Sequence, residues 1–192
     1  MKKRNIIRLI LNIICTSHII ILLSFGIAAA IDRDELRVKA GLDLFPSLLT
    51  ADLDIENKKG SDGFITILLV YTDNRTQATE MALALSQIEK IRNIPIRVEI
   101  SNDLTMNSHK DRHPAGIYIT QPLDEKLSEV VRFAIENGIV LFSPFKGDVE
   151  KGVLGGIYIS DRVLPYINLA SMESSGINIK KFFIKVSVSY EP

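Results

Sequence analysis

The chain has few of the residues on which several kinds of protein chemistry depend. Its 192 residues include one cysteine, Cys15, and no tryptophan. Cys15 lies inside an apolar stretch near the N-terminus, so removal of that stretch would leave a chain without a thiol. Such a chain can form no disulfide, hold no metal through thiolates and use no thiol nucleophile. Its stability must then come from its core alone.

An excess of charge of either sign is also missing, because 23 basic residues balance 23 acidic ones. Lys2, Lys3, Arg4 and Arg8 lie in the first 30 residues, where there is no acidic residue. The rest of the chain therefore carries 19 basic against 23 acidic residues, a net charge of −4. Binding to a phosphate backbone requires a positive face. The sequence therefore predicts no nucleic-acid partner.

Motifs for catalysis and for metal binding are missing as well. The sequence contains no G-x-S-x-G elbow, no Walker lysine motif and no G-x-G-x-x-G. His109 and His113 have the spacing of two metal ligands on a helix, but Pro114 and the polar residues before it indicate a solvated loop. We therefore predict a protein that is not an enzyme, with no catalytic residue, no metal site and no cofactor.

The first 30 residues have the composition of a secretory signal. A basic start leads into an apolar run that ends in Ala28, Ala29 and Ala30, the small residues that signal peptidase accepts. We predict a signal peptide over residues 1–30 and an exported, periplasmic domain over residues 31–192. The run from Leu9 to Ala30 is also about as long as a membrane span, so an uncleaved anchor is the alternative.

The apolar pattern beyond the signal predicts helices and strands in alternation. A first helix begins near Leu36 and is kinked or shortened by Pro46. From residue 63 the predicted order is strand, helix, strand, strand, helix and strand, with the strands at 63–73, 94–100, 115–122 and 139–145. This order is typical of a single layered α/β domain, with a largely parallel sheet and helices on both faces. A doubly wound topology is the expected one.

Residues 152–176 are predicted to extend this sheet. Two strand-like runs on either side of Ser160 and Asp161 indicate a hairpin. Gly155 and Gly156 precede a strand and not a helix, so we interpret them as a close backbone approach or a bulge, not as a phosphate site. Pro165 has no amide hydrogen, which places the second run at an edge of the sheet.

A short capped helix is predicted after the hairpin. Asn168 is suited to cap a helix over residues 169–175, and Gly176 to end it. The pattern of residues 177–192 fits a helix and a strand equally well, and it leaves both open.

Two groups of polar residues are candidates for an interaction or ligand surface. Doubly wound sheets bind ligands at the carboxyl ends of their strands, where this chain has Asp73 and Asn74 after one strand and Thr120 and Gln121 after another. The second group, Asp161 and Arg162, belongs to the turn of the predicted hairpin. A small-ligand receptor is one function that the strand-end residues would suit.

Several short motifs, taken in order, resemble those of the YfiR-like periplasmic family. The resemblance extends over residues 36–187. The residues that carry it are Lys39-Ala40-Gly41-Leu42, Ile65 to Val70, Gly116-Ile117-Tyr118-Ile119, Gly152 to Gly156, Ile167-Asn168-Leu169-Ala170 and Gly176-Ile177.

This resemblance implies a non-enzymatic, exported domain similar in fold to half of a periplasmic binding protein. It also implies a partner, the periplasmic domain of a membrane-bound diguanylate cyclase or sensor, which the protein would restrain by contact; a homodimer is left open. Members of the family use disulfides to tune that restraint. The absence of cysteine after the signal excludes a disulfide switch in this chain.

Overall fold

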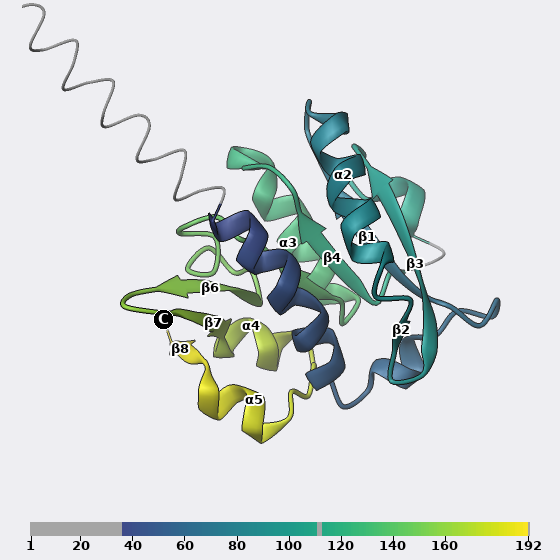
Figure 1. Ribbon diagram of the computed structural model, residues 1–192. Helices are drawn as coiled ribbons and strands as arrows, with labels where there is room; N and C mark the ends of the chain where they lie inside the picture. The colour runs from purple at the N-terminus through teal and green to yellow at the C-terminus, as the bar shows by residue number, and fades with distance from the viewer. Residues whose placement is uncertain (1–35, 111–112, 192) are drawn as a thin grey trace, which may run out of the picture. The chain divides into compact units, whose positions relative to one another are not determined.

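The fold is built on one sheet, shown in Figure 1. The computed structural model describes residues 36–110 and 113–191, so the predicted signal peptide lies outside the described residues. The sheet order is β2-β3-β1-β4-β5-β6-β7-β8. The strands are β1 (Ile65–Val70), β2 (Lys90–Ile91), β3 (Ile94–Ser101), β4 (Gly116–Ile119), β5 (Val140–Phe142), β6 (Gly155–Ile159), β7 (Val163–Asn168) and β8 (Val188–Tyr190).

The middle of the sheet is parallel, as predicted. Strands β3, β1, β4, β5 and β6 run in one direction. At the two ends, β2 is antiparallel to β3, and β7 is antiparallel to β6, while β8 runs parallel to β7. The four strands predicted between residues 63 and 145 correspond to β1, β3, β4 and β5.

Helices cover both faces of the sheet. The first helix spans residues 36–51, and the later ones are α2 (Arg75–Ser86), α3 (Leu127–Glu136), α4 (Leu169–Ser174) and α5 (Lys181–Val186). The first helix and α2 contribute to one buried cluster, and α3 contributes to another on the opposite face. Short 3-10 turns connect these elements at η1 (Ile55–Lys58), η2 (Asn107–His109) and η3 (Asp124–Lys126).

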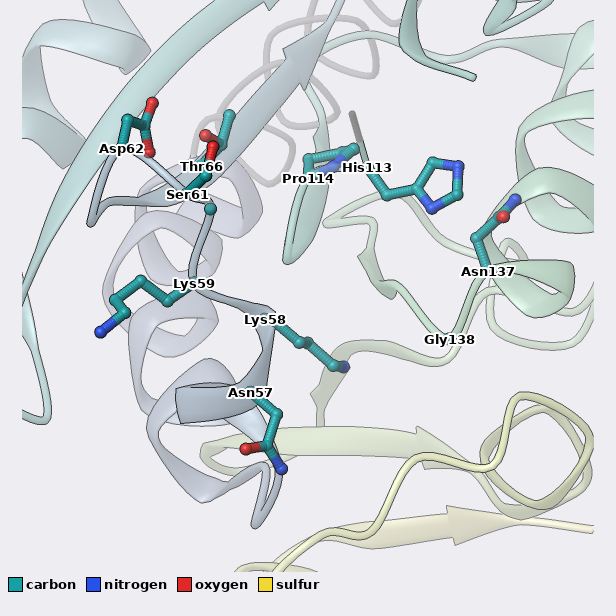
Figure 2. Close-up of a pocket in the computed structure, with 11 residues that line it drawn as sticks. Asn57, Lys58, Lys59, Ser61, Asp62, Thr66, His113, Pro114, Asn137 and Gly138 are labelled. Carbon is teal, nitrogen blue, oxygen red and sulfur yellow. The ribbon is translucent and has the colours of Figure 1, made fainter. Parts of the chain in front are cut away.

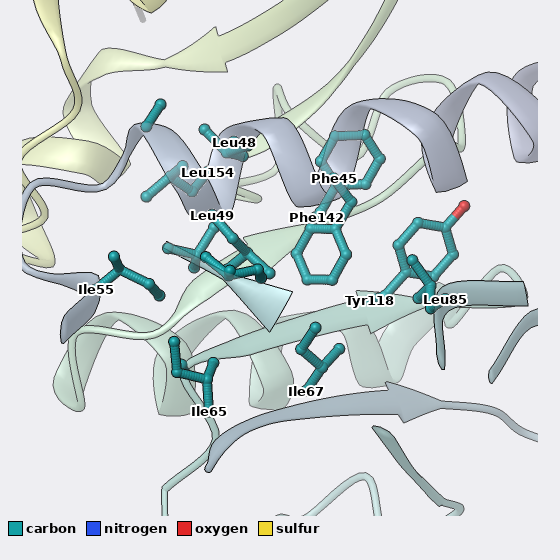
Figure 3. Packing of buried hydrophobic residues seen from close by; sticks show 14 of the residues in the cluster. Phe45, Leu48, Leu49, Ile55, Ile65, Ile67, Leu85, Tyr118, Phe142 and Leu154 are labelled. Carbon is teal, nitrogen blue, oxygen red and sulfur yellow. The ribbon is translucent and has the colours of Figure 1, made fainter. Parts of the chain in front are cut away.

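Strand β1 supplies side chains to both clusters because alternate residues of a strand point to opposite faces. Ile65, Ile67 and Leu69 belong to the cluster beneath the first helix, which Figure 3 shows, and Leu68 and Val70 belong to the cluster beneath α3. A strand buried on both faces needs a continuous apolar sequence. This explains why residues 63–73 read as a central strand.

An aromatic cluster fixes the first helix to β4 and β5. The rings of Tyr118 and Phe142 are stacked with their centroids 5.6 Å apart, and the Phe45 ring lies 5.5 Å from that of Tyr118. The buried Tyr118 hydroxyl donates a hydrogen bond of 3.2 Å to the backbone oxygen of Val38, and burial raises its pKa. A Cβ on Gly41 would come within 2.7 Å of that hydroxyl oxygen. The helix can therefore lie this close only with glycine at residue 41.

Of the two effects predicted for Pro46, a kink or a shortening of the first helix, the shortening is wrong, because the helix continues to residue 51. A proline inside a helix removes one backbone hydrogen bond, at a cost of about 3 kcal/mol. Phe45, Leu48 and Leu49 on either side of it are almost completely buried in the core. The burial of these three side chains offsets the lost hydrogen bond.

The predicted hairpin is confirmed as β6 and β7, and its two glycines allow the close backbone approach that was expected. A Cβ on Gly155 would lie 2.5 Å from Cδ2 of Leu48. One on Gly156 would lie 2.5 Å from Cγ2 of Val149 and 2.9 Å from the backbone oxygen of Ser143. The backbone of β6 therefore packs directly against the first helix and the loop after β5.

The edge position predicted from Pro165 is wrong, because β7 lies between β6 and β8. Strand β8 pairs only with Tyr166, Ile167 and Asn168 of β7. The pairing with β8 begins at Tyr166, one residue after Pro165, so the missing amide hydrogen of Pro165 interrupts no bond to β8. Residues 177–192 contain both of the structures left open, since α5 is followed by β8.

The predicted cap of the short helix is confirmed. The side-chain oxygen of Asn168 accepts a 2.9 Å hydrogen bond from the backbone N–H of Ser171, and its amide nitrogen donates one of 2.7 Å to the backbone oxygen of Val149. Gly176 has a φ of +65°, in the left-handed region that favours glycine after a helix. Asn168 therefore joins α4 to the loop after β5.

Candidate functional site

The chain leaves the sheet in opposite directions after two adjacent strands. Strands β1 and β4 are parallel neighbours, but α2 follows β1 on one face and α3 follows β4 on the other. Such a divergence is where doubly wound sheets bind ligands. Four of the predicted site residues lie here, Asp73 and Asn74 after β1 and Thr120 and Gln121 after β4.

Gln121 joins the two strand ends. The backbone N–H groups of Thr72, Asp73 and Asn74 donate to its side-chain oxygen, at 2.9, 3.2 and 3.4 Å, and the hydroxyl of Thr72 lies 2.6 Å from the same atom. Because four donors converge on it, this atom is the amide oxygen and not the nitrogen. The structure therefore brings Asp73, Asn74 and Gln121 together, as the strand-end argument predicted.

The N–H groups of Thr72, Asp73 and Asn74 lie in the turn that leads into α2, just before its first residue. The first N–H groups of a helix have no acceptor within the helix, and its N-terminus carries a partial positive charge. Asn74 caps the helix by accepting a 3.0 Å hydrogen bond from the N–H of Gln77. Gln121 supplies the acceptor for the three N–H groups that come immediately before.

The amide nitrogen of Gln121 is left without a partner. Gln121 is only 7% exposed, and its nitrogen is buried and makes no hydrogen bond within the described residues. A primary amide has two N–H donors, and a buried polar group without a partner costs about 1–3 kcal/mol. An acceptor that could reach this nitrogen would remove that cost.

The two remaining residues at the strand ends differ in exposure. Thr120 is completely buried, and its hydroxyl donates to the backbone oxygen of Val70 at 2.8 Å, so its side chain offers no surface. Asp73 is exposed, and its carboxylate lies 3.3 Å from the Thr72 hydroxyl. The Thr72 hydroxyl lies closer to the side-chain oxygen of Gln121, at 2.6 Å. The Asp73 carboxylate is therefore open to solvent.

The loop after β5 contains a buried acid that the sequence analysis did not single out. The hydroxyl of Ser143 donates to Oδ2 of Asp148 at 2.6 Å, and its oxygen accepts from the N–H of Phe145 at 3.1 Å. Burial raises the pKa of Asp148 above its ordinary value, and the hydrogen bond from Ser143 opposes this rise only in part. The loop also contains Lys146, Glu150 and Lys151, so the sequence carried no signal that distinguished Asp148 from a solvated acid.

Asp161 and Arg162 lie at the tip of the hairpin, as predicted, and both are exposed. The Ser160 hydroxyl donates to Oδ1 of Asp161 at 2.8 Å, and the N–H of Ser160 donates to the backbone oxygen of Arg162 at 3.1 Å. The tip and Gln121 both follow the carboxyl ends of parallel strands, β6 and β4, but β5 lies between these two strands. The two predicted groups therefore form separate surfaces.

A hollow of about 600 Å³ lies beside the amino ends of β1, β4 and β5, at the other end of these strands from Gln121. Figure 2 shows residues that line it. Of its lining residues, only His113 was weighed as a metal ligand from the sequence, and its ring packs edge-on against that of Phe133 at 5.7 Å. Nζ of Lys58 is 2.6 Å from Oδ2 of Asp52, a completely buried carboxylate. The Lys58 charge is thus paired within the protein. The described residues contain no group of three or more side chains placed to hold a metal ion.

Large apolar side chains remain exposed at several places on the surface. Phe182 and Val186 on α5 are 76% and 44% exposed, and Leu83 on α2 is 62% exposed. Phe183 and Ile184, between the two residues of α5, pack against the buried cluster. No helix in the described residues has the length and apolar character that crossing a membrane requires.

Comparisons with known proteins give a likeness of fold. No protein family model matches the chain, and no curated protein matches it in sequence. The chain is similar to an ABC domain from Streptococcus pneumonia in complex with L-Trp, with a TM-score of 0.50 and 13% identity over 79% of this chain. It spans 59% of that protein's length.

Two further solved structures are similar at a lower score. A conserved domain protein from Vibrio cholerae has a TM-score of 0.49 and 13% identity, over 70% of this chain and 57% of that one. A substrate binding protein with adhesive properties from Clostridium difficile, in its ligand-free, open form, has a TM-score of 0.49 and 15% identity, over 73% and 58%. The layered, largely parallel α/β fold predicted from the sequence is confirmed by the sheet and by the likeness to the L-Trp-bound domain.

Proposed function

We propose that the chain is an exported, non-enzymatic binding module that acts through contact with another protein. The observation that carries this proposal is the exposure of two large apolar side chains on α5. Phe182 and Val186 are four residues apart, so they lie on one face of the helix, and both are exposed, whereas Phe183 and Ile184 pack against the buried cluster. Exposed apolar side chains that gather on one element mark interaction sites.

The finer proposal concerns the partner. The resemblance to YfiR-like proteins implies that the module docks on the periplasmic domain of a membrane-bound diguanylate cyclase or sensor and restrains it. Export of the domain follows from the signal-like composition of residues 1–30. A partner domain outside the inner membrane would then be within its reach.

Crosslinking in intact cells tests this proposal. Replacing Phe182 and Val186 together with serine should reduce recovery of the crosslinked partner at least about ten-fold, the loss expected for two apolar anchors at the centre of an interface. Leu83→Ser is the matched control, because Leu83 is as exposed but lies on α2, away from β7 and β8, which α5 contacts. Equal recovery from both variants would contradict the α5 interface. A partner without a cyclase or sensor domain would contradict the finer proposal.

A small-ligand receptor is the second candidate function. The observation that favours it is the buried amide nitrogen of Gln121, which has no partner at the point where β1 and β4 diverge. Binding of any small solute to the purified chain, measured as a rise in melting temperature, would support this candidate.

A further inference from the structure

We propose that the end of the sheet between β1 and β4 binds the zwitterionic part of a free α-amino acid. The α-carboxylate would lie on the N–H groups of Thr72, Asp73 and Asn74 and on the amide nitrogen of Gln121, and the α-ammonium on the carboxylate of Asp73. This inference rests on the small-ligand candidate and is independent of the protein contact through α5.

The three N–H groups form the first half of the argument. They converge on one oxygen atom, at distances of 2.9 to 3.4 Å, at the N-terminus of a helix of 12 residues. The neutral amide oxygen of Gln121 occupies this position in the present structure. A carboxylate oxygen would make stronger bonds there, because charge-assisted hydrogen bonds are stronger than neutral ones and the helix N-terminus favours negative charge.

The amide nitrogen of Gln121, which has no hydrogen-bond partner among the described residues, is the second, independent observation. It belongs to a side chain that is more than nine-tenths buried and that lies against the helix N-terminus, yet it has no acceptor among the described residues. If a ligand carboxylate takes the place of the amide oxygen, the displaced amide can rotate so that its nitrogen donates to the second carboxylate oxygen. The amide oxygen of Gln121 would then accept hydrogen bonds in the absence of ligand, and its nitrogen would donate one in the presence of ligand.

Asp73 decides which carboxylates fit. Its carboxylate is exposed, has no ion-pair partner in the described residues and lies next to the Thr72 hydroxyl. A simple anion would be repelled by this neighbouring charge. A zwitterion instead offers an ammonium group one carbon away from its carboxylate, which would pair with Asp73.

Binding of the free L-amino acids to the purified full chain tests the proposal. We expect at least one of them, at a concentration of about 10 mM, to raise the melting temperature. Its methyl ester and its N-acetyl derivative should each bind at least about ten-fold more weakly, because each lacks one charge-assisted contact. Asp73→Asn should cause a similar loss. Asp161→Asn, which changes an exposed carboxylate at the hairpin tip, should leave the affinity unchanged.

Gln121→Glu provides a variant that tests the carboxylate position. Its own carboxylate would occupy the three N–H groups without a donor for the ligand, so affinity should fall at least about ten-fold while the fold is retained. Binding that is unaffected by Asp73→Asn or by Gln121→Glu would overturn the proposal, and so would the absence of any amino-acid binding. If only uncharged solutes bind, the receptor function stands and the zwitterion site does not.

Discussion

The hydroxyl of Ser143 donates a hydrogen bond of 2.6 Å to the carboxylate of Asp148, and both side chains are buried in the loop after β5. The same loop packs against β6, where a Cβ on Gly156 would lie 2.5 Å from Cγ2 of Val149. The carboxylate therefore lies at a junction between the parallel part of the sheet and the hairpin. Its state of ionisation should affect the stability of that junction.

Asp148→Asn should remove a pH dependence of stability. Burial raises the pKa of Asp148 in the folded state above its value of 3.8 in the unfolded chain, so the folded state holds the proton more tightly. The free energy of unfolding must then fall as the pH rises from 3.8 through the folded-state pKa. The asparagine, which still accepts from Ser143, does not titrate. Its melting temperature should exceed that of the wild type at pH 7, and the difference should shrink toward pH 4.

Glu150→Gln is the control for this experiment, because Glu150 is an exposed carboxylate of the same loop. It should change the melting temperature at pH 7 much less than Asp148→Asn does, because an exposed carboxylate stays solvated in the folded state. A constant difference between wild type and Asp148→Asn at all pH values from 4 to 8 would show that Asp148 does not titrate as its burial requires.

The sequence predicted the elements whose evidence is local. Strand β1 is apolar on both faces, and Asn74 and Asn168 each come directly before a helical pattern, so all three could be recognised without knowledge of the fold. The shortening predicted from Pro46 and the edge position predicted from Pro165 were wrong. The rule for Pro46 concerns one backbone hydrogen bond and ignores the burial of its neighbours, and the rule for Pro165 ignores how far β8 extends along β7.

The site was only partly predictable for a related reason. The strand-end rule located Gln121, but it could not tell which of its atoms is bonded, because the donors come from Thr72 to Asn74, 47 to 49 residues earlier in the chain. The pair of Asp52 and Lys58 and the acid at Asp148 were not found, since their burial depends on helices and loops distant in sequence. Contacts of this kind follow from the assembled sheet.

Gly41→Ala should destabilise the protein, and Tyr118→Phe should partly restore it. The new Cβ would lie 2.7 Å from the Tyr118 hydroxyl oxygen, and overpacking of a core costs about 1–3 kcal/mol. Removing the hydroxyl relieves this contact but not those at 3.2 Å with Phe142 and Pro144. Urea unfolding of the two single variants and the double variant gives the coupling energy. Additive effects would contradict a direct clash.

Asn168→Ala should cost more stability than Asn74→Ala, although both remove the cap of a helix. Loss of a cap costs about 0.5–2 kcal/mol. Asn74 is exposed, and its side chain caps α2 alone. Asn168 is 3% exposed and also donates to the backbone oxygen of Val149, which would keep only its longer bond from the N–H of Gly152. We expect the Asn168 variant to lose about 0.5–1.5 kcal/mol more than the Asn74 variant in urea unfolding, the net contribution of one buried hydrogen bond. Equal costs would show that the Val149 bond contributes nothing.

Lys58→Met should be among the most destabilising single changes around the hollow, which lies beside the amino ends of β1, β4 and β5. The Asp52 carboxylate is completely buried and lies 2.6 Å from Nζ of Lys58. Removing one member of a buried ion pair leaves an uncompensated charge and costs about 3–5 kcal/mol. Lys59→Met is the control, since Lys59 lines the same hollow without an ion-pair partner in the described residues. Asp52→Asn combined with Lys58→Met removes the charge as well, so the double variant should be more stable than Lys58→Met alone. If it is not, the cost arises from lost packing of the lysine stem and not from the unpaired carboxylate.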